Sequence, residues 1–206
     1  MLFRSQKLPG ISSVTEALDR VIANVPLLSG LTPLQLREFM LDSEVRTPGA
    51  GDFVFKYNDY TTTFFSILEG EVQIQIDPED PSQVIPLRQG QFFGEMSLIS
   101  GRRRSATVVA GNGCVLIETP RRSMNKLIAS VESVKRTIDE TFLVRAIQAQ
   151  VAPDTPIDQL SDLVHSATIE TYNANEVIFK EGDPGDSLHL IRVGSVTASR
   201  NIGDRE

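Results

Sequence analysis

Three residue types within one predicted loop could together hold a phosphorylated sugar: Gly94, Glu95 and Arg104. Gly94 permits a close backbone approach that a side chain would block. Arg104 supplies a permanently charged fork of N–H donors that suits phosphate oxygens. Glu95 would repel a phosphate, so we expect it to accept a hydrogen bond from a sugar hydroxyl. The three types therefore describe a pocket for a ribose phosphate.

The residues that follow Gly94 are expected to form a short helix over 95–99. The first N–H groups of such a helix have no partners within it, and they favour an anion. The expected site therefore runs from Phe93 to Thr107.

A simpler interpretation exists for each charged residue of this loop. Arg102, Arg103 and Arg104 could be a solvated charge run, and Glu95 could only stabilise the start of a helix. The occurrence of both features at this spacing in a strand-rich region favours the phosphate pocket.

Helices are expected on both sides of the strand-rich region. Ser13 predicts the start of a first helix, and Thr32 followed by Pro33 predicts a second. Thr119-Pro120 predicts a third helical stretch that extends to about residue 150. Within it, Phe142 and Ile147 could form a lid over a bound base, but ordinary helix packing is the favoured interpretation.

Short runs of β-like sequence occupy the region between these helices. The run 71–76 alternates polar and apolar residues, and 83–87 is a further candidate strand. Gly111-Asn112-Gly113 lies between two apolar runs, 106–110 and 114–118, and predicts a β-hairpin. Many short strands indicate a rolled sandwich, so the predicted fold class is α+β, a β-roll or jelly roll flanked by helices.

The sequence also repeats itself. Residues 54–59 resemble 178–183, and the same displacement carries Ile67 onto Ile191 and Gly70 onto Gly194 without a gap. This register predicts a duplication. The counterpart of 93–107 would fall beyond Glu206, so we expect an incomplete second unit in an excised fragment of a longer protein. Its uncovered strand edges would be poorly ordered, or would be completed by a second copy in a homodimer.

Four segments follow from these patterns. They are an N-terminal helical segment (1–25), a helix and β-roll (26–118), connecting helices (119–150) and a truncated second repeat (151–206).

The segment Phe93-Gly-Glu-Met-Ser-Leu followed by Arg104-Ser-Ala-Thr107 resembles the phosphate-binding cassette of cyclic-nucleotide-binding domains. That family includes protein kinase A regulatory subunits, cyclic-nucleotide-gated channels and bacterial catabolite activators. The run 67–72 and the turn 182–187 are also similar to the family's β-roll. The resemblance covers 26–150 fully and 155–206 in part, and it implies cAMP or cGMP as the ligand.

The resemblance also implies individual roles. Arg104 would bind the cyclic phosphate, Glu95 would accept from the ribose 2′-hydroxyl, and neighbouring backbone groups would complete the cradle. The expected ligand-binding residues are Phe93, Gly94, Glu95, Met96, Ser97, Arg104, Ser105 and Ala106.

Three features depart from the family's pattern. Ser105 stands at a position where family members that prefer cAMP often have an alanine. Its hydroxyl could bind a guanine and favour cGMP, or it could form only a local hydrogen bond. Arg103 replaces a frequent proline, which removes no ligand. The turn 58–63 lacks the Gly-Asp-Pro-Gly pattern that 182–187 keeps, and we expect no direct effect on the pocket.

Composition excludes several classes of function. With 27 acidic and 20 basic residues, the net charge of −7 disfavours nucleic-acid binding by this fragment. The single cysteine, Cys114, predicts a buried core residue and a reducing, cytoplasmic location. His165 and His189 lack metal-ligand spacing, so no metal is expected. No apolar stretch is long enough to cross a membrane, and no nucleophile–base pair indicates an enzyme.

Two hypotheses of function remain from the sequence. The first is a regulatory sensor that binds a cyclic nucleotide and relays its occupancy through residues 119–150 to an effector outside this fragment. The alternative is a degenerate, non-binding domain that acts as a scaffold for dimerisation or protein interaction. A transcription factor and a kinase inhibitor are both unsupported within these residues.

Overall fold

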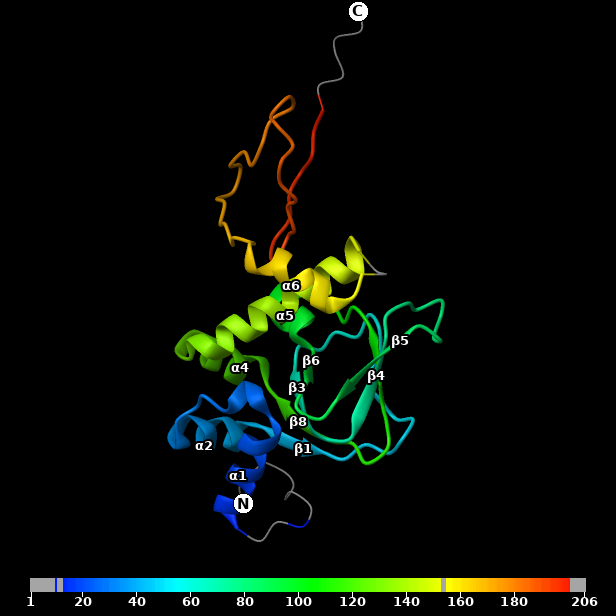
Figure 1. The fold of residues 1–206 in the computed structure, drawn as a ribbon, viewed down its shortest axis with the longest axis vertical. Coiled ribbons are helices and arrows are strands. Elements are labelled where there is room, and N and C mark those ends of the chain that lie inside the picture. Colours follow the sequence, from blue (N-terminus) through cyan, green and yellow to red (C-terminus); the bar gives the residue numbers. More distant parts are fainter. Residues whose placement is uncertain (1–9, 11–12, 153–154, 201–206) are drawn as a thin grey trace, which may run out of the picture.

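The computed structural model describes residues 10, 13–152 and 155–200. Two antiparallel sheets of four strands each form a sandwich, and helices cover the outer face of one sheet (Figure 1). The first sheet has the order β1 (Glu44–Arg46), β8 (Val115–Thr119), β3 (Phe64–Glu69) and β6 (Phe92–Phe93). The second has the order β2 (Phe53–Phe55), β7 (Thr107–Ala110), β4 (Glu71–Gln75) and β5 (Val84–Arg88). The predicted α+β class with a jelly-roll-like pair of sheets is confirmed.

Strand β3 separates the two cores of the molecule. Phe65 and Ile67 face the core between the sheets, whereas Phe64 and Leu68 face the helices. Successive side chains of a strand point to opposite faces. Because both faces of β3 are covered, its run of apolar residues is buried without the polar alternation of a half-exposed strand.

Six α-helices and one 3-10 turn accompany the sheets in the described residues. They are α1 (Val14–Asn24), η1 (Pro26–Leu28), α2 (Pro33–Asp42), α3 (Glu95–Ser100), α4 (Arg121–Ser130), α5 (Glu132–Gln150) and α6 (Ile157–His165). Val21 of α1, Leu36 of α2 and Ile138 of α5 share one apolar core with β3. The N-terminal helix is therefore part of the same core as the β-roll.

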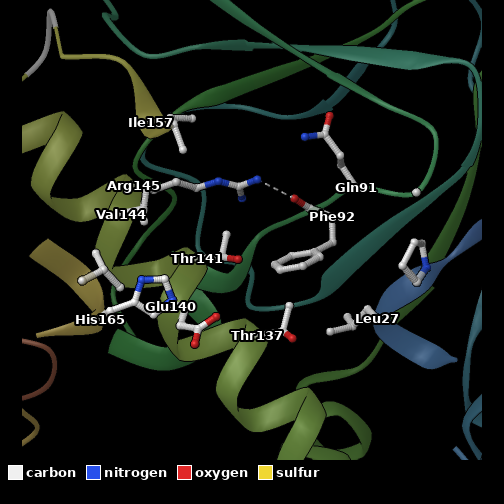
Figure 2. Close-up of a pocket in the computed structure, with 13 residues that line it drawn as sticks. Leu27, Gln91, Phe92, Thr137, Glu140, Thr141, Val144, Arg145, Ile157 and His165 are labelled. Carbon is white, nitrogen blue, oxygen red and sulfur yellow. Dashed lines mark hydrogen bonds between the residues drawn. The ribbon is translucent and has the colours of Figure 1, made fainter. Parts of the chain in front are cut away.

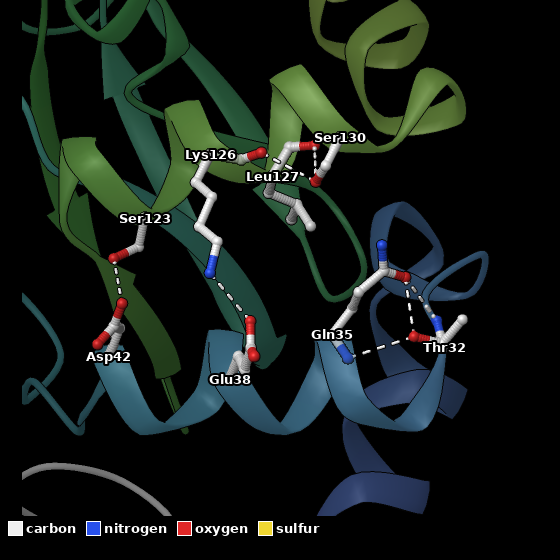
Figure 3. Close-up of polar contacts among 8 residues, drawn as sticks. All are labelled: Thr32, Gln35, Glu38, Asp42, Ser123, Lys126, Leu127 and Ser130. Carbon is white, nitrogen blue, oxygen red and sulfur yellow. Dashed lines mark hydrogen bonds and ion pairs between the residues drawn. The ribbon is translucent and has the colours of Figure 1, made fainter.

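The predicted helix starts are partly confirmed. Ser13 Oγ accepts a hydrogen bond from the Glu16 backbone. At α2, Thr32 and Gln35 form a full capping box, with 2.9 Å from Thr32 N to Gln35 Oε1 (Figure 3). The sequence Thr119-Pro120 also suggests Thr119 as the N-cap of α4, and this interpretation is wrong. Pro120 holds that position, and the Thr119 hydroxyl instead lies 3.0 Å from the Ser43 hydroxyl.

Two polar pairs join α2 to α4 (Figure 3). Ser123 Oγ donates to Asp42 Oδ2 at 2.7 Å, and Lys126 Nζ lies 3.0 Å from Glu38 Oε2. The second pair is exposed, so it contributes well under about 1 kcal/mol to stability. Both pairs hold α4 against α2.

The predicted hairpin at Gly111-Asn112-Gly113 is wrong, because the strands on its two sides belong to different sheets. Strand β7 pairs with β2 and β4, whereas β8 pairs with β1 and β3. The segment crosses between sheets by packing over the turn between β3 and β4. A Cβ on Gly70, whose φ is +72°, would lie 2.7 Å from the carbonyl oxygen of Asn112. A glycine is therefore required where the two connections meet.

The helical stretch predicted from residue 119 to 150 is divided. Val131 adopts an extended conformation, with φ −129° and ψ 103°, between α4 and α5. The stretch therefore forms two helices, α4 and α5, in place of one.

The region predicted as a truncated second repeat, 151–206, contains one helix and no strand among its described residues. Helix α6 lies at the expected place, while residues 166–200 contain no strand and extend away from the sandwich (Figure 1).

Candidate functional site

The last residue of β6, Phe93, and the loop between β6 and β7 contain every residue predicted for the site. Gly94 has φ +91° and ψ 0°, and α3 begins directly after it and spans six residues. Gly101, also left-handed with φ +70°, ends α3 and turns the chain toward Arg104. The two glycines fold the loop back on itself, so Gly94, Ser97 and Arg104 meet.

Gly94 has room for no side chain. A Cβ at this position would lie 2.9 Å from Arg104 Nη1 and 2.9 Å from the Thr63 carbonyl oxygen. The close approach predicted for Gly94 is thus present, and the groups that approach it are Arg104 of the same loop and Thr63 at the end of the turn before β3.

Arg104 lies inside the protein, with 2% of its surface exposed. Its Nε donates to Thr61 Oγ1 at 2.8 Å, and its Nη1 donates to Ser97 Oγ at 2.8 Å and lies 3.5 Å from the Gly94 carbonyl. Its Nη2 donates to the carbonyl and the hydroxyl of Thr63, at 2.8 and 3.2 Å. The five N–H donors of the guanidinium therefore face protein oxygens.

The plane of the guanidinium also lies against aromatic rings. Its central carbon is 3.9 Å from the centre of Phe55 and 5.9 Å from that of Phe65. Burial lowers the pKa of Arg104 to about 10, while the charges of Glu118, Glu95 and Asp59 oppose this shift. Arg104 is therefore a buried cation at neutral pH, surrounded by acceptors that carry no full charge.

The other predicted residues of the loop occupy different environments. Phe93 belongs to the core between the sheets and stacks on Phe65, with ring centres 5.0 Å apart. Ser97 is buried, Met96 and Ala106 are half-buried, and Ser105 is exposed. Phe93 therefore supports the loop from the core, while Ser105 lies where it could meet solvent or a base.

Glu95 is buried and paired with a cation that the sequence analysis did not identify. Its Oε2 lies 2.9 Å from Arg145 Nη1, and only 1% of Glu95 is exposed. Arg145 belongs to α5, and its Nη2 also donates to the Phe92 carbonyl at 3.0 Å, as Figure 2 shows. One side chain of α5 therefore contacts the residues on both sides of Phe93 and Gly94.

The sequence of helix α5 contained a signal that could have predicted the role of Arg145 as the partner of an anion. It lies between Phe142 and Ala146, both buried, so it stands at the edge of the apolar face of α5. A cation at that position needs an anion from the sheet side, and the buried Glu95 needed a cation. Ile147 packs with Leu160 and Val164 of α6, in agreement with the packing interpretation.

The turn 58–63 contacts the site directly, so the expectation that it has no direct effect is wrong. Thr61 and Thr63 supply three of the oxygens around Arg104. Three consecutive threonines before a buried strand were the available signal, because their hydroxyls can accept from a buried arginine.

A groove of about 370 Å³ lies beside Phe92. It is lined by η1, by the residues before β6 and by α5 and α6, with Arg145 at its edge (Figure 2). Movement of α6 would therefore change the surroundings of the residue that pairs with Glu95.

Two further findings concern the described part of the chain. No group of three or more potential metal ligands occurs among residues 10, 13–152 and 155–200. Within the same residues, no helix has the length and apolar character needed to cross a bilayer.

Part of the chain is similar in sequence to known proteins. Residues 46–131 match the family model of the cyclic nucleotide-binding domain. The chain is 27% identical over 200 residues to a cAMP-dependent protein kinase regulatory subunit of Dictyostelium discoideum. That match covers 94% of this chain and 60% of the relative. It is 32% identical over 126 residues to a cyclic nucleotide-gated potassium channel of Mesorhizobium japonicum, a match that covers 61% of this chain and 34% of the channel.

A solved structure shows the same fold. The Thermus thermophilus catabolite activator protein superposes with a TM-score of 0.52 at 25% identity. The match covers 63% of this chain and 62% of that protein. This chain thus spans less than two thirds of the length of each of these three proteins.

Proposed function

Residues 46–131 belong to the cyclic nucleotide-binding domain family, and from this premise we propose that the chain is a sensor that binds cAMP or cGMP in the loop 93–106. The observation that carries the proposal is the position of Arg104, a buried cation beside Gly94 and Ser97. Such a group is well suited to hold a cyclic phosphate, because its charge is desolvated and its forked donors match the geometry of phosphate oxygens.

The proposed roles follow from the position of each group. Arg104 would bind the phosphate, and Glu95 would accept from the ribose hydroxyl while Arg145 holds its other side. The backbone at Gly94, Met96 and Ala106 would complete the cradle, with Phe93 and Ser97 as its supports. Ser105 is exposed, which leaves its hydroxyl available to a guanine. No metal or cofactor takes part in this proposal.

We propose that Arg145 relays occupancy. It contacts Glu95 and the Phe92 carbonyl from α5, so a change at Glu95 acts directly on that helix. A ligand shifts such an equilibrium only through different affinities for two positions of α5. The readout is hydrogen exchange of α5 and α6 with and without nucleotide, and Arg145→Ala should remove the nucleotide-dependent change while the loop stays protected.

The proposal extends to the region after α5, which we interpret as the beginning of a second repeat. The alignment with the kinase regulatory subunit extends well beyond 46–131, which supports a second nucleotide-binding repeat after α6. Phe179, Leu188 and Val193 are exposed. Exposed apolar groups of this size favour association, either with further parts of a longer protein or with a second copy. Sedimentation should show a dimer if the second copy is the partner.

A single experiment separates the sensor from a non-binding scaffold. Ligand at one hundred times its dissociation constant should stabilise the fold by about 2.7 kcal/mol. We therefore expect a higher melting temperature with millimolar cAMP or cGMP. An unchanged melting temperature with both nucleotides would favour the scaffold, for which the fully bonded Arg104 is the supporting observation.

A further inference from the structure

The turn 58–63, which precedes β3, is joined through its backbone to the loop 93–106. Arg104 N donates to the Asp59 carbonyl at 3.0 Å, and Asn58 N donates to the Arg104 carbonyl at 2.9 Å. Tyr57 N donates to Thr107 Oγ1 at 2.9 Å. Three hydrogen bonds thus fix the turn beside the loop on both sides of the arginine.

The turn is also braced internally and by the neighbouring arginine. Asp59 Oδ2 accepts from Lys56 N at 2.8 Å, and Asp59 N donates to the Lys56 carbonyl at 3.1 Å. Arg103 Nη1 donates to the Asn58 carbonyl at 3.0 Å, and its guanidinium lies 5.3 Å from the centre of the Tyr60 ring. The threonines that follow are therefore presented to Arg104 by a held backbone.

Thr61 and Thr63 occupy the donors of Arg104 that face the turn. Thr61 accepts the Nε–H, and the carbonyl and hydroxyl of Thr63 accept both hydrogens of Nη2. Ser97 and Gly94 receive the donors of Nη1 on the other side. An oxygen of a bound phosphate can gain a short hydrogen bond from Nε or Nη2 only where a threonine oxygen gives it up.

We propose that the hydroxyls of Thr61 and Thr63 compete with the phosphate for Arg104 and thereby set the affinity for the cyclic nucleotide. This inference rests on the proposed nucleotide binding and adds the residues that tune it. The competition is unequal, because a phosphate oxygen carries negative charge and pairs with the guanidinium as an ion, whereas the threonine oxygens are neutral. Nucleotide therefore wins the donors, but at a cost in affinity for each threonine bond that is broken.

The test compares three valine substitutions within the same turn. Thr61→Val and Thr63→Val each remove one hydroxyl that accepts from Arg104, with almost no change of shape. Thr62→Val is the matched control, since Thr62 has no hydrogen bond to Arg104 in the structure. Loss of one competing bond should strengthen binding about fivefold in the calorimetric dissociation constant. Thr62→Val and Thr61→Ser, which keeps the hydroxyl, should bind as the wild type does.

The double variant Thr61→Val/Thr63→Val separates this inference from the proposed function. If the wild type binds neither nucleotide but the double variant binds one, the competition is supported and only the ordinary affinity was misjudged. If neither protein binds, both proposals are contradicted. A third outcome is that the wild type binds and that Thr61→Val and Thr63→Val bind no more tightly than Thr62→Val. The nucleotide site then stands and the competition is overturned.

A second measurement examines the hydrogen bond itself before nucleotide is added. The Nε–H resonance of Arg104 should exchange faster with solvent in Thr61→Val than in the wild type and in Thr62→Val, because only the first variant removes its acceptor. Equal exchange in all three proteins would contradict the bond on which the inference depends. Thermal unfolding of each variant shows that the comparison is made between folded proteins.

Discussion

Glu95 Oε2 and Arg145 Nη1 lie 2.9 Å apart and join the first residue of α3 to the last third of α5. The Glu95 side chain is 1% exposed and the Arg145 side chain is 23% exposed, so solvent reaches the ion pair only from the arginine side. Glu95, the acid expected to hold the sugar, thus links the loop 93–106 to the helix α5.

Removal of Arg145 should destabilise the fold. Arg145→Ala leaves the buried Glu95 carboxylate without its cation, and we expect a loss of about 3 kcal/mol in the free energy of unfolding measured in urea. Arg46→Ala is a matched control, because Arg46 pairs with Glu118 at 3.0 Å but is half exposed, so its loss should cost below about 1 kcal/mol.

A double-mutant cycle isolates the contribution of the pair. Glu95→Gln removes the charge that Arg145 balances, so Arg145→Ala should cost much less in that background than in the wild type. Equal costs in the two backgrounds would show that Arg145 acts through packing alone.

Substitution of Gly94 should prevent both correct folding of the loop and nucleotide binding. In Gly94→Ala the new methyl group would meet Arg104 Nη1 and the Thr63 carbonyl at 2.9 Å, at a φ of +91°. Gly51→Ala is the control for backbone strain, because Gly51 has φ +89° and nothing within 4 Å of its added Cβ.

The two alanine variants should therefore differ in a defined way. Gly51→Ala should lose about 1 kcal/mol of stability from strain alone and should bind nucleotide normally. Gly94→Ala should lose more stability and show no binding by calorimetry. Similar losses in both would mean that the space beside Gly94 is not critical.

Cys114 should be unreactive in the folded protein. It is buried, and burial raises the pKa of its thiol from 9.0 to about 11. At pH 8 the thiolate fraction is thus reduced about hundredfold, and alkylation by iodoacetamide should be at least that much slower in the folded protein than in guanidinium.

The raised thiol pKa also has a consequence for stability. Between pH 9 and 11 the unfolded chain loses the thiol proton while the folded chain keeps it. The free energy of unfolding should therefore fall as the pH rises through this range. Cys114→Ala should show a smaller fall, and identical pH profiles for the two proteins would contradict the assignment.

Two buried serines should respond to alanine with opposite signs. Ser66 Oγ has no hydrogen-bond partner among the described residues, whereas Ser43 Oγ donates to the Phe39 carbonyl at 2.7 Å. Ser66→Ala should raise the free energy of unfolding by about 1 kcal/mol, and Ser43→Ala should lower it by a similar amount. Urea melts of the two variants test this, and destabilisation by Ser66→Ala would show that its hydroxyl has an undetected partner.

The contacts within the loop 93–106 could be predicted from the sequence because they are local. Gly94, Glu95 and Arg104 lie in one short segment whose glycines and short helix bring them together. The helix starts at Ser13 and Thr32 were predictable for the same reason, since a cap depends on residues three positions apart.

Contacts between distant segments were beyond this kind of analysis. Arg145 meets Glu95 only because α5 returns across β6, and Thr61 meets Arg104 only because the turn pairs with the loop. The glycines at 111–113 have the composition of a hairpin, but the β3–β4 turn packed beneath them directs the chain into the other sheet. Turn composition specifies local backbone shape and not the identity of the next strand partner.

The most direct test of the central claim is a calorimetric titration of the wild type, Arg104→Lys and Arg102→Lys with cAMP and with cGMP. Lysine keeps the charge but loses the forked donors, so Arg104→Lys should weaken binding by about 100-fold or more. Arg102 is exposed, so Arg102→Lys should bind as the wild type does. Equal affinities in Arg104→Lys and the wild type would contradict a cyclic-nucleotide site built on Arg104, and so would absence of binding to both the wild type and Thr61→Val/Thr63→Val.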